Sequence, residues 1–110
     1  MENEVILWKA PQPGRSAERE IIDGFDAQLY PGNGPYFATV KAIAVGFSNI
    51  YGNGLQEIHF SRTVFDELVA RGVIVADTFY DPNESYYVPA ARLTEFNEAM
   101  KQGKCFCEKP

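Results

Sequence analysis

Two hydrophobic periods alternate along the chain, and together they predict interleaved strands and helices. Segments rich in β-branched and aromatic residues predict strands at residues 4–10, 35–38, 55–61, 73–79 and 86–88. Segments with helical spacing, bounded by capping residues and glycines, predict helices at residues 17–23, 40–51, 64–71 and 89–102. Because the strands are short and loops occupy much of the chain, we expect an α+β domain with a split, mostly antiparallel mixed β-sheet and flanking helices.

The starts of three helices carry local signals. Ser16 is expected to cap the first helix and Thr39 the second, because Ser and Thr hydroxyls accept hydrogen bonds from the free amides of the first turn. Thr63 and Asp66 have the spacing of a capping box and are expected to open the third helix.

The second helix carries a single apolar stripe. Val40, Ile43, Ala44, Phe47 and Tyr51 fall at positions i, i+3, i+4, i+7 and i+11. This spacing places all five side chains on one side of a helix. We therefore expect this side to pack against the sheet.

Composition and charge limit the classes of function. With 110 residues, of which 45% are hydrophobic and 23% charged, the chain is expected to form one domain at residues 1–103, with residues 104–110 as a C-terminal tail. No apolar run approaches the roughly 20 residues that a membrane-spanning helix needs, so no membrane partner is expected. A formal charge of −5 and a pI near 4.8 oppose non-specific nucleic-acid binding, which needs clustered Lys and Arg.

The first residues, "MENEVILWKAP", carry acids where a secretion signal would carry basic residues. We therefore expect a cytoplasmic protein, or one delivered into a target cell by a route other than general secretion.

Few residues have the side chains of common catalytic or metal sites. Cys105 and Cys107 lie in the expected tail and are interpreted as inert, an intermolecular or redox role being the alternative. Two thiols and the single His59 are too few ligands for tetrahedral zinc, so no metal is expected. Glu57 could orient His59, but no nucleophile accompanies the pair, which favours a partly exposed strand histidine.

Aromatic residues are numerous for a small domain. Rings fixed by a sheet can sandwich a planar ligand, but core packing uses the same residues, and the pattern taken alone favours packing. The rings are Trp8, Tyr30, Tyr36, Phe37, Phe47, Tyr51, Tyr86 and Tyr87.

Three segments, "ILWKAP", "GNGPYFATVKAIAVGF" and "NESYYVPAARL", follow one another along the chain. The first resembles the opening strand of the poly(ADP-ribose) polymerase and diphtheria-toxin-like branch of the ADP-ribosyltransferases. The second is similar to that family's glycine, tyrosine, phenylalanine and alanine segment with the helix behind it. The third is similar to its last motif, an asparagine and glutamate before a hydrophobic strand. The resemblance spans about residues 5–97 and extends to many small bacterial toxin and effector domains.

The resemblance implies a site for NAD, which this family uses as a substrate. There the nicotinamide ring lies between two aromatic rings, and a glutamate on the last strand promotes departure of nicotinamide. Tyr36 and Phe47 would be the two rings, Phe37 follows Tyr36 in the same motif, and Glu84 would be the glutamate. We expect the glycines of "GNG" to let the backbone come close to the ligand and to aim Tyr36 at it.

Four positions depart from the family pattern, and one of them is Phe47, which stands in place of the family's tyrosine. Lys9 stands where the family has the histidine that anchors the cofactor ribose, and Ala10 where it has the glycine whose backbone holds the nicotinamide amide. Lysine can donate to a ribose hydroxyl or meet a pyrophosphate oxygen, but its flexible cation is poorly preorganised. Ala44 replaces a serine that commonly binds the amide, a loss of one hydrogen bond worth about 1 kcal/mol.

The resemblance implies an NAD-dependent mono-ADP-ribosyltransferase, a glycosyltransferase that acts as a toxin or effector. It would transfer a single ADP-ribose to a macromolecule or hydrolyse NAD, with a protein acceptor or a cognate immunity protein as partner. The alternative is a non-catalytic protein of the same fold that binds a protein or nucleotide, which the changes at Lys9 and Ala44 favour. A third hypothesis, an acidic immunity-type partner of a basic toxin, fits the charge of −5.

Overall fold

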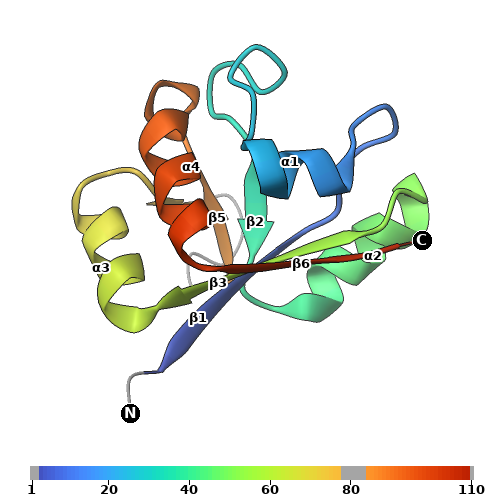
Figure 1. Cartoon of the computed structure of the whole chain (residues 1–110). Helices are drawn as coiled ribbons and strands as arrows, with labels where there is room; N and C mark the ends of the chain where they lie inside the picture. Colours follow the sequence, from blue (N-terminus) through green and yellow to red (C-terminus); the bar gives the residue numbers. More distant parts are fainter. Residues whose placement is uncertain (1–2, 78–83, 110) are drawn as a thin grey trace.

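A computed structural model describes residues 3–77 and 84–109 as an α+β domain (Figure 1). A six-stranded sheet carries helices α1, α3 and α4 on one face and α2 on the other. In chain order the elements are β1 (Glu4–Lys9), α1 (Ala17–Asp23), β2 (Tyr36–Ala38), α2 (Lys41–Tyr51), β3 (Leu55–Ser61), α3 (Arg62–Ala70), β4 (Val75–Ala76), β5 (Ser85–Tyr87), the 3₁₀ turn η1 (Ala90–Arg92), α4 (Leu93–Gln102) and β6 (Lys104–Glu108).

The sheet has the strand order β4-β5-β2-β1-β3-β6. β3 pairs with β1 along the whole length of β1, whereas β2 meets β1 only where Ala38 lies opposite Trp8. The sheet therefore consists of two halves, β1-β3-β6 and β2-β5-β4, joined at one registered pair. The split that we expected in the sheet lies at this β1–β2 pairing.

The expectation of a mixed sheet is wrong for the described strands, since every pairing among them is antiparallel. Helices alternate with strands in the sequence, which is typical of parallel sheets. Here, however, β1 lies between β2 and β3, and both run against it. Antiparallel neighbours tolerate a partly solvated sheet face, which suits strands this short.

The main core lies between the sheet and helices α3 and α4, together with Phe25, which follows α1 (Figure 1). Phe96 of α4 is 0% exposed, and its ring centroid lies 5.2 Å from that of Phe37, 5.7 Å from Phe60 and 6.1 Å from Phe25. Edge-on and tilted ring pairs of this kind stabilise a core beyond the burial of their area. A smaller cluster, which includes Ala44 of α2, lies on the opposite face.

The predicted cap of α1 is confirmed, whereas the predicted cap of α3 is wrong. Ser16 caps α1 as expected, and its hydroxyl accepts a hydrogen bond from the Arg19 amide at 3.3 Å. The cap of α3 is Ser61, whose hydroxyl accepts from the Val64 amide at 3.2 Å, and not Thr63, which lies inside the helix. The helix starts early because β3 passes into α3 without an intervening loop.

Thr39 does not cap α2, which begins at Lys41 with Val40 in the capping position. The Thr39 amide instead donates to the Glu84 carbonyl at 2.9 Å. This bond extends the backbone pairing of β2 and β5 by one residue, although Thr39 itself lies in the bend between β2 and α2. Sheet pairing has overridden the local capping preference.

The segment expected to be a tail is an edge strand. β6 pairs with β3, with Cys105 opposite Ile58 and Cys107 opposite Gln56, and both cysteines are free. Gly103 allows this approach, because a Cβ there would lie 2.5 Å from the His59 carbonyl oxygen. A five-residue strand that follows a helix directly gives little local signal, and β3 supplies the pairing that holds it.

The predicted strand at residues 73–79 is shorter than expected. Only Val75 and Ala76 form β4, while Val73 and Ile74 are fully buried in the core and residues 78–79 lie outside the described residues. The strand predicted at 86–88 is β5, and the expected last helix is η1 followed by α4. None of the helices in the described ranges has the length and apolar character that crossing a lipid bilayer requires.

Candidate functional site

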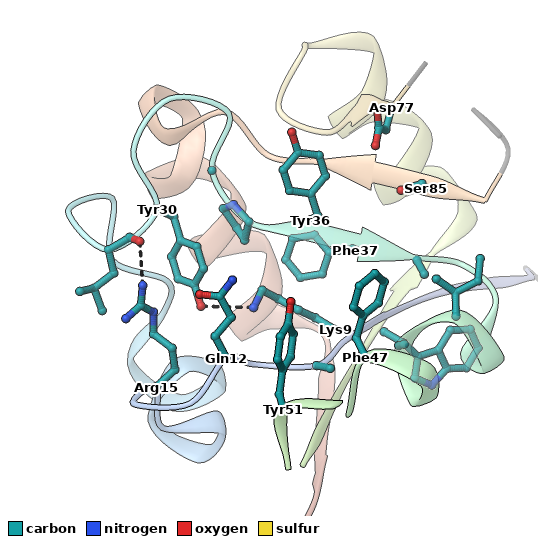
Figure 2. A pocket seen from close by; sticks show the side chains of 18 of the residues that line it. Lys9, Gln12, Arg15, Tyr30, Tyr36, Phe37, Phe47, Tyr51, Asp77 and Ser85 are labelled. Atoms are coloured by element: carbon teal, nitrogen blue, oxygen red, sulfur yellow. Dashed lines mark hydrogen bonds between the residues drawn. The ribbon is translucent and has the colours of Figure 1, made fainter. Parts of the chain in front are cut away.

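A pocket of about 700 Å³ opens where β1 and β2 separate, and we call it the β1–β2 pocket (Figure 2). Its volume falls within the range of small-molecule sites, roughly 300–1,000 Å³. It is lined by residues of β1, β2, α2 and β5 and of the segments after β1, before β2, after β4 and before β5: Trp8, Lys9, Ala10, Gln12, Arg15, Leu29, Tyr30, Pro31, Gly34, Pro35, Tyr36, Phe37, Ala38, Ile43, Ala44, Phe47, Tyr51, Asp77, Glu84 and Ser85. The pocket thus joins both halves of the sheet.

Helix α2 forms one wall. Ala44 is 3% exposed and is the contact point between the helix and the sheet, whereas Phe47 is 44% exposed. The Phe47 and Tyr51 rings stack with centroids 6.0 Å apart and an interplanar angle of 23°. We had expected the apolar stripe of this helix to pack against the sheet. Only Ala44 does so closely, and the larger side chains of the stripe face the pocket. Small Ala44 brings the helix close, and its larger neighbours border the opening.

Strand β2 forms the facing wall, and its alternation separates two roles. Phe37 is 2% exposed and packs in the main core, so little of its surface is open to the pocket that it lines. Tyr36 is 47% exposed, its ring lies 5.6 Å from that of Tyr87, and its hydroxyl accepts a hydrogen bond from Asn33 Nδ2 at 3.2 Å. Tyr36 therefore offers a free aromatic surface.

The glycine before this strand meets a packing requirement within the protein. Gly34 has φ 71°, and a Cβ at this position would lie 1.8 Å from the Val88 carbonyl oxygen. The close approach that demands glycine is thus between two backbone segments. Gly34 lines the β1–β2 pocket as well, but the packing of the loop against residue 88 already requires it.

Lys9, at the end of β1, is only 7% exposed and borders the pocket. Its ammonium donates to the Tyr30 hydroxyl at 3.2 Å and lies 4.9 Å from the centre of the Tyr30 ring and 5.9 Å from that of Phe25. Burial lowers the pKa of Lys9 to about 8, an effect that nearby Glu20 partly opposes. The lysine is therefore held in place by aromatic packing, unlike the flexible cation that we expected from its residue type.

A buried polar network fixes Tyr30 from below. The Tyr30 hydroxyl donates to Glu20 Oε2 at 2.5 Å, and Gln56 Nε2 donates to Glu20 Oε1 at 2.9 Å. Burial, followed by the hydrogen bond to Glu20, raises the pKa of Tyr30. This network connects Lys9 to α1 and β3, and sequence analysis missed its polar members because they are far apart in the chain.

Arg15 is a second cation that sequence analysis missed. Its guanidinium carbon lies 5.3 Å from the centre of the Tyr30 ring, and one of its terminal nitrogens donates to the Leu29 carbonyl at 3.1 Å (Figure 2). Its Nε is buried and has no hydrogen-bond partner among the described residues. The only sequence signal was a basic residue in the loop after β1.

Acidic residues border the pocket at the other end. Figure 2 shows Asp77 and Ser85 at the upper right, across the opening from Arg15 and Tyr30. Asp77 is buried, and its backbone amide donates to the Ser85 carbonyl at 2.9 Å. Glu84, half-buried, precedes β5 and also borders the pocket. The pocket therefore has a cationic end and an acidic end, with aromatic rings between them.

The structure brings all the residues that the three sequence segments singled out to this one pocket: Lys9, Ala10, Tyr36, Phe37, Ala44, Phe47 and Glu84. Of the wider aromatic set, Trp8, Tyr30 and Tyr51 also line it, whereas Tyr86 and Tyr87 do not. These positions are separated by up to 75 residues in the sequence, from Lys9 to Glu84.

His59 and the cysteines lie elsewhere. His59 Nδ1 is 2.5 Å from Glu4 Oε2, and Nε2 is 2.6 Å from Glu57 Oε2. Burial lowers the pKa of His59, but the hydrogen bonds to Glu57 and Glu4 outweigh it, so the pKa is raised. No group of three His, Cys, Asp or Glu side chains within residues 3–77 and 84–109 is arranged to hold a metal ion.

Comparisons with protein-family models, with curated proteins and with solved structures give no significant match to this chain. The function must therefore be argued from the β1–β2 pocket itself.

Proposed function

We propose that the protein is an ADP-ribosyltransferase-like domain that binds NAD in the β1–β2 pocket. It either transfers a single ADP-ribose to a macromolecule or hydrolyses NAD. The observation that carries this proposal is that residues from three separate segments, each similar to a motif of that family, line one pocket. The pocket is also large enough for a small-molecule ligand, at about 700 Å³.

The aromatic walls are the proposed nicotinamide site. Tyr36 on β2 and Phe47 on α2 are both substantially exposed and both line the pocket, so their faces are available to a planar ring. Stacking of this kind contributes about 0.5–1.5 kcal/mol for each ring pair beyond burial. The backbone at Ala10 would hold the amide, and Ala44, which lacks a hydroxyl, would only shape the wall.

Glu84 is the proposed catalytic carboxylate. In the reaction, the bond between ribose C1′ and the nicotinamide nitrogen breaks, and nicotinamide leaves with the electron pair. The C1′ centre then bonds to an acceptor nucleophile or to water, which releases a proton. Because positive charge develops on the sugar before the new bond forms, an adjacent carboxylate stabilises the transition state. Among the described residues, no side chain donates to the Glu84 carboxylate, which leaves it available.

Replacing Glu84 by Gln tests the catalytic part. NAD turnover should fall by roughly 100-fold or more, the cost of removing one stabilising group in other enzymes, while the unfolding transition stays unchanged. Glu98→Gln, which removes an exposed carboxylate on α4 outside the pocket, is the matched control and should retain full turnover. Equal NAD consumption by the wild type and the Glu84 variant would remove Glu84 from the mechanism.

A non-catalytic binding module is the second candidate, and one observation favours it. The Lys9 ammonium donates to Tyr30 and packs against its ring, so the histidine that anchors the ribose in the family has no direct equivalent. Calorimetric titration with NAD and with nicotinamide separates the two functions. Binding of NAD without turnover supports the module, whereas a folded protein that binds neither at millimolar concentration contradicts both uses of the pocket.

A further inference from the structure

Two cations lie against one aromatic ring at the cationic end of the β1–β2 pocket. The Lys9 ammonium is 4.9 Å and the Arg15 guanidinium carbon 5.3 Å from the centre of the Tyr30 ring. Both residues line the pocket, and Figure 2 shows Lys9 and Arg15 on either side of that ring. Their proximity has an electrostatic effect, since Arg15 contributes to the lowered pKa of Lys9.

These charges are incompletely compensated. Neither Lys9 nor Arg15 forms an ion pair within the described part of the chain, and Glu20, the carboxylate that acts on Lys9, is bonded to Tyr30 and Gln56. Lys9 uses one of its three donors on Tyr30. Arg15 uses one terminal nitrogen on the Leu29 carbonyl, and its Nε is buried without a partner. Several charged donors therefore remain available to a ligand.

We infer that Lys9 and Arg15 form a subsite for the diphosphate group of a nucleotide, an inference that rests on the proposed function. Phosphate oxygens are strong acceptors for ammonium and guanidinium donors, and a diphosphate offers oxygens on two phosphorus atoms to two separate cations. Asp77 borders the opposite end of the pocket (Figure 2), and Glu84, which directly precedes Ser85 in the chain, also lines the pocket; their charges disfavour an anion beside them. The ligand is thereby oriented with its diphosphate at Tyr30 and its neutral or cationic ring between Tyr36 and Phe47.

Ligand binding at this subsite should be linked to proton uptake. The pKa of Lys9 is lowered to about 8, so about half of the molecules carry a neutral Lys9 at pH 8. The charged groups that face it are Glu20 of α1, which raises its pKa, and Arg15, which lowers it, while Tyr30 accepts its hydrogen bond. A bound diphosphate adds negative charge beside Lys9 and favours its protonated form.

The affinity test uses ADP-ribose, because it contains the diphosphate but cannot undergo nicotinamide cleavage. Calorimetry on the full chain should show ADP-ribose binding that weakens roughly 10-fold or more in Arg15→Gln and in Lys9→Met. Arg19→Gln is the matched control, since its side chain is 81% exposed on α1 and outside the pocket. Adenosine, which lacks the diphosphate, should bind equally to the wild type and all three variants.

The linkage test repeats the ADP-ribose titration at pH 8 in two buffers of different ionisation enthalpy. Wild-type protein should take up on the order of 0.5 proton for each ADP-ribose bound, and Lys9→Met should take up none. Arg15 lies in a loop, so Arg15→Gln decides the affinity test if Lys9→Met fails to fold. Absence of ADP-ribose binding, or affinity unchanged within about twofold in the folded variants, would overturn the inference.

These outcomes are distinguishable from failure of the proposed function. If ADP-ribose binding depends on Arg15 and Lys9 but NAD is not consumed, the diphosphate subsite stands and the transferase chemistry fails. If NAD turnover depends on Glu84 but ADP-ribose affinity is the same in Arg15→Gln, Lys9→Met and the wild type, the inference of a diphosphate subsite is wrong and the proposed chemistry stands.

Discussion

The face of the sheet under α3 and α4 is filled by large apolar side chains, whereas the face under α2 leaves aromatic rings exposed around a pocket. Phe96 and Phe47 illustrate the difference, since both are phenylalanines on helices that cover a sheet, but one is 0% and the other 44% exposed. The first face holds the fold together. The second is held at a few contacts around Ala44 and keeps its rings available for a ligand.

The largest expected effect contrasts these two faces directly. Phe96→Ala should lower the free energy of unfolding by about 3–5 kcal/mol, because it leaves a cavity among three aromatic neighbours. Phe47→Ala should lower it by less than about 1 kcal/mol, because the ring is already partly solvated, but should weaken binding of planar ligands. Denaturant unfolding measures both variants, and equal losses of stability would contradict the division into a structural and a ligand-binding face.

The next effect concerns the loop that begins the pocket wall. Gly34→Ala should cost about 2–4 kcal/mol of stability, because it combines a positive φ with a Cβ only 1.8 Å from the Val88 carbonyl oxygen. Gly32→Ala is its control, since Gly32 has a similar φ of 70° but no atom within 4 Å of the added Cβ. The control should lose about 1–2 kcal/mol. Thermal unfolding of the two variants should therefore separate backbone strain from the steric clash.

A smaller effect tests the polar support under the cationic end. Tyr30→Phe removes the hydroxyl that links Lys9 to Glu20 and should cost about 1–3 kcal/mol, because both partners are left buried without it. Tyr36→Phe removes an exposed hydroxyl whose one hydrogen-bond partner among residues 3–77 and 84–109 is Asn33, and it should change stability by less than about 0.5 kcal/mol. A larger loss of stability in Tyr36→Phe than in Tyr30→Phe would mean that the hydrogen-bond network around Tyr30 does not stabilise the cationic end of the pocket.

The smallest effect is a pH dependence of stability outside the pocket. The pKa of His59 is raised in the folded state, so its stabilising contribution is complete below the unfolded value of about 6.5 and is lost as pH rises through the folded value. The pKa of Glu57 is lowered, mainly by its bond to His59, so its contribution is lost as the solution becomes acidic. Melting temperatures of wild type and His59→Gln should therefore converge above the folded pKa of His59, and a constant difference would contradict this.

Local patterns predicted the elements whose causes are local. The alternation in β1 and β3 and the Ser16 cap of α1 depend on neighbouring residues, and both were correct. Predictions failed where distant segments compete for the same backbone groups. The Thr39 amide pairs with Glu84, and β6 exists because β3 offers an open edge.

The pocket shows the same limit. Motif resemblance singled out seven of its residues, because each lies within a recognisable segment. Arg15, Tyr30 and Glu20 carry no such signal, since their arrangement depends on how the loop before β2 folds over β1. Lys9 illustrates the consequence, because its residue type suggests a mobile surface cation while its packing makes it a fixed one.

The single registered pair between Trp8 and Ala38 has a mechanical consequence. The side of the pocket that carries Lys9 belongs to the half-sheet of β1, and the side that carries Tyr36 belongs to the half-sheet of β2. A small rotation of one half-sheet against the other about the Trp8–Ala38 pair would change the width of the pocket and leave the strand pairing within each half intact. The width of the pocket opening therefore depends on the β1–β2 pairing, which has the fewest registered residue pairs in the described sheet.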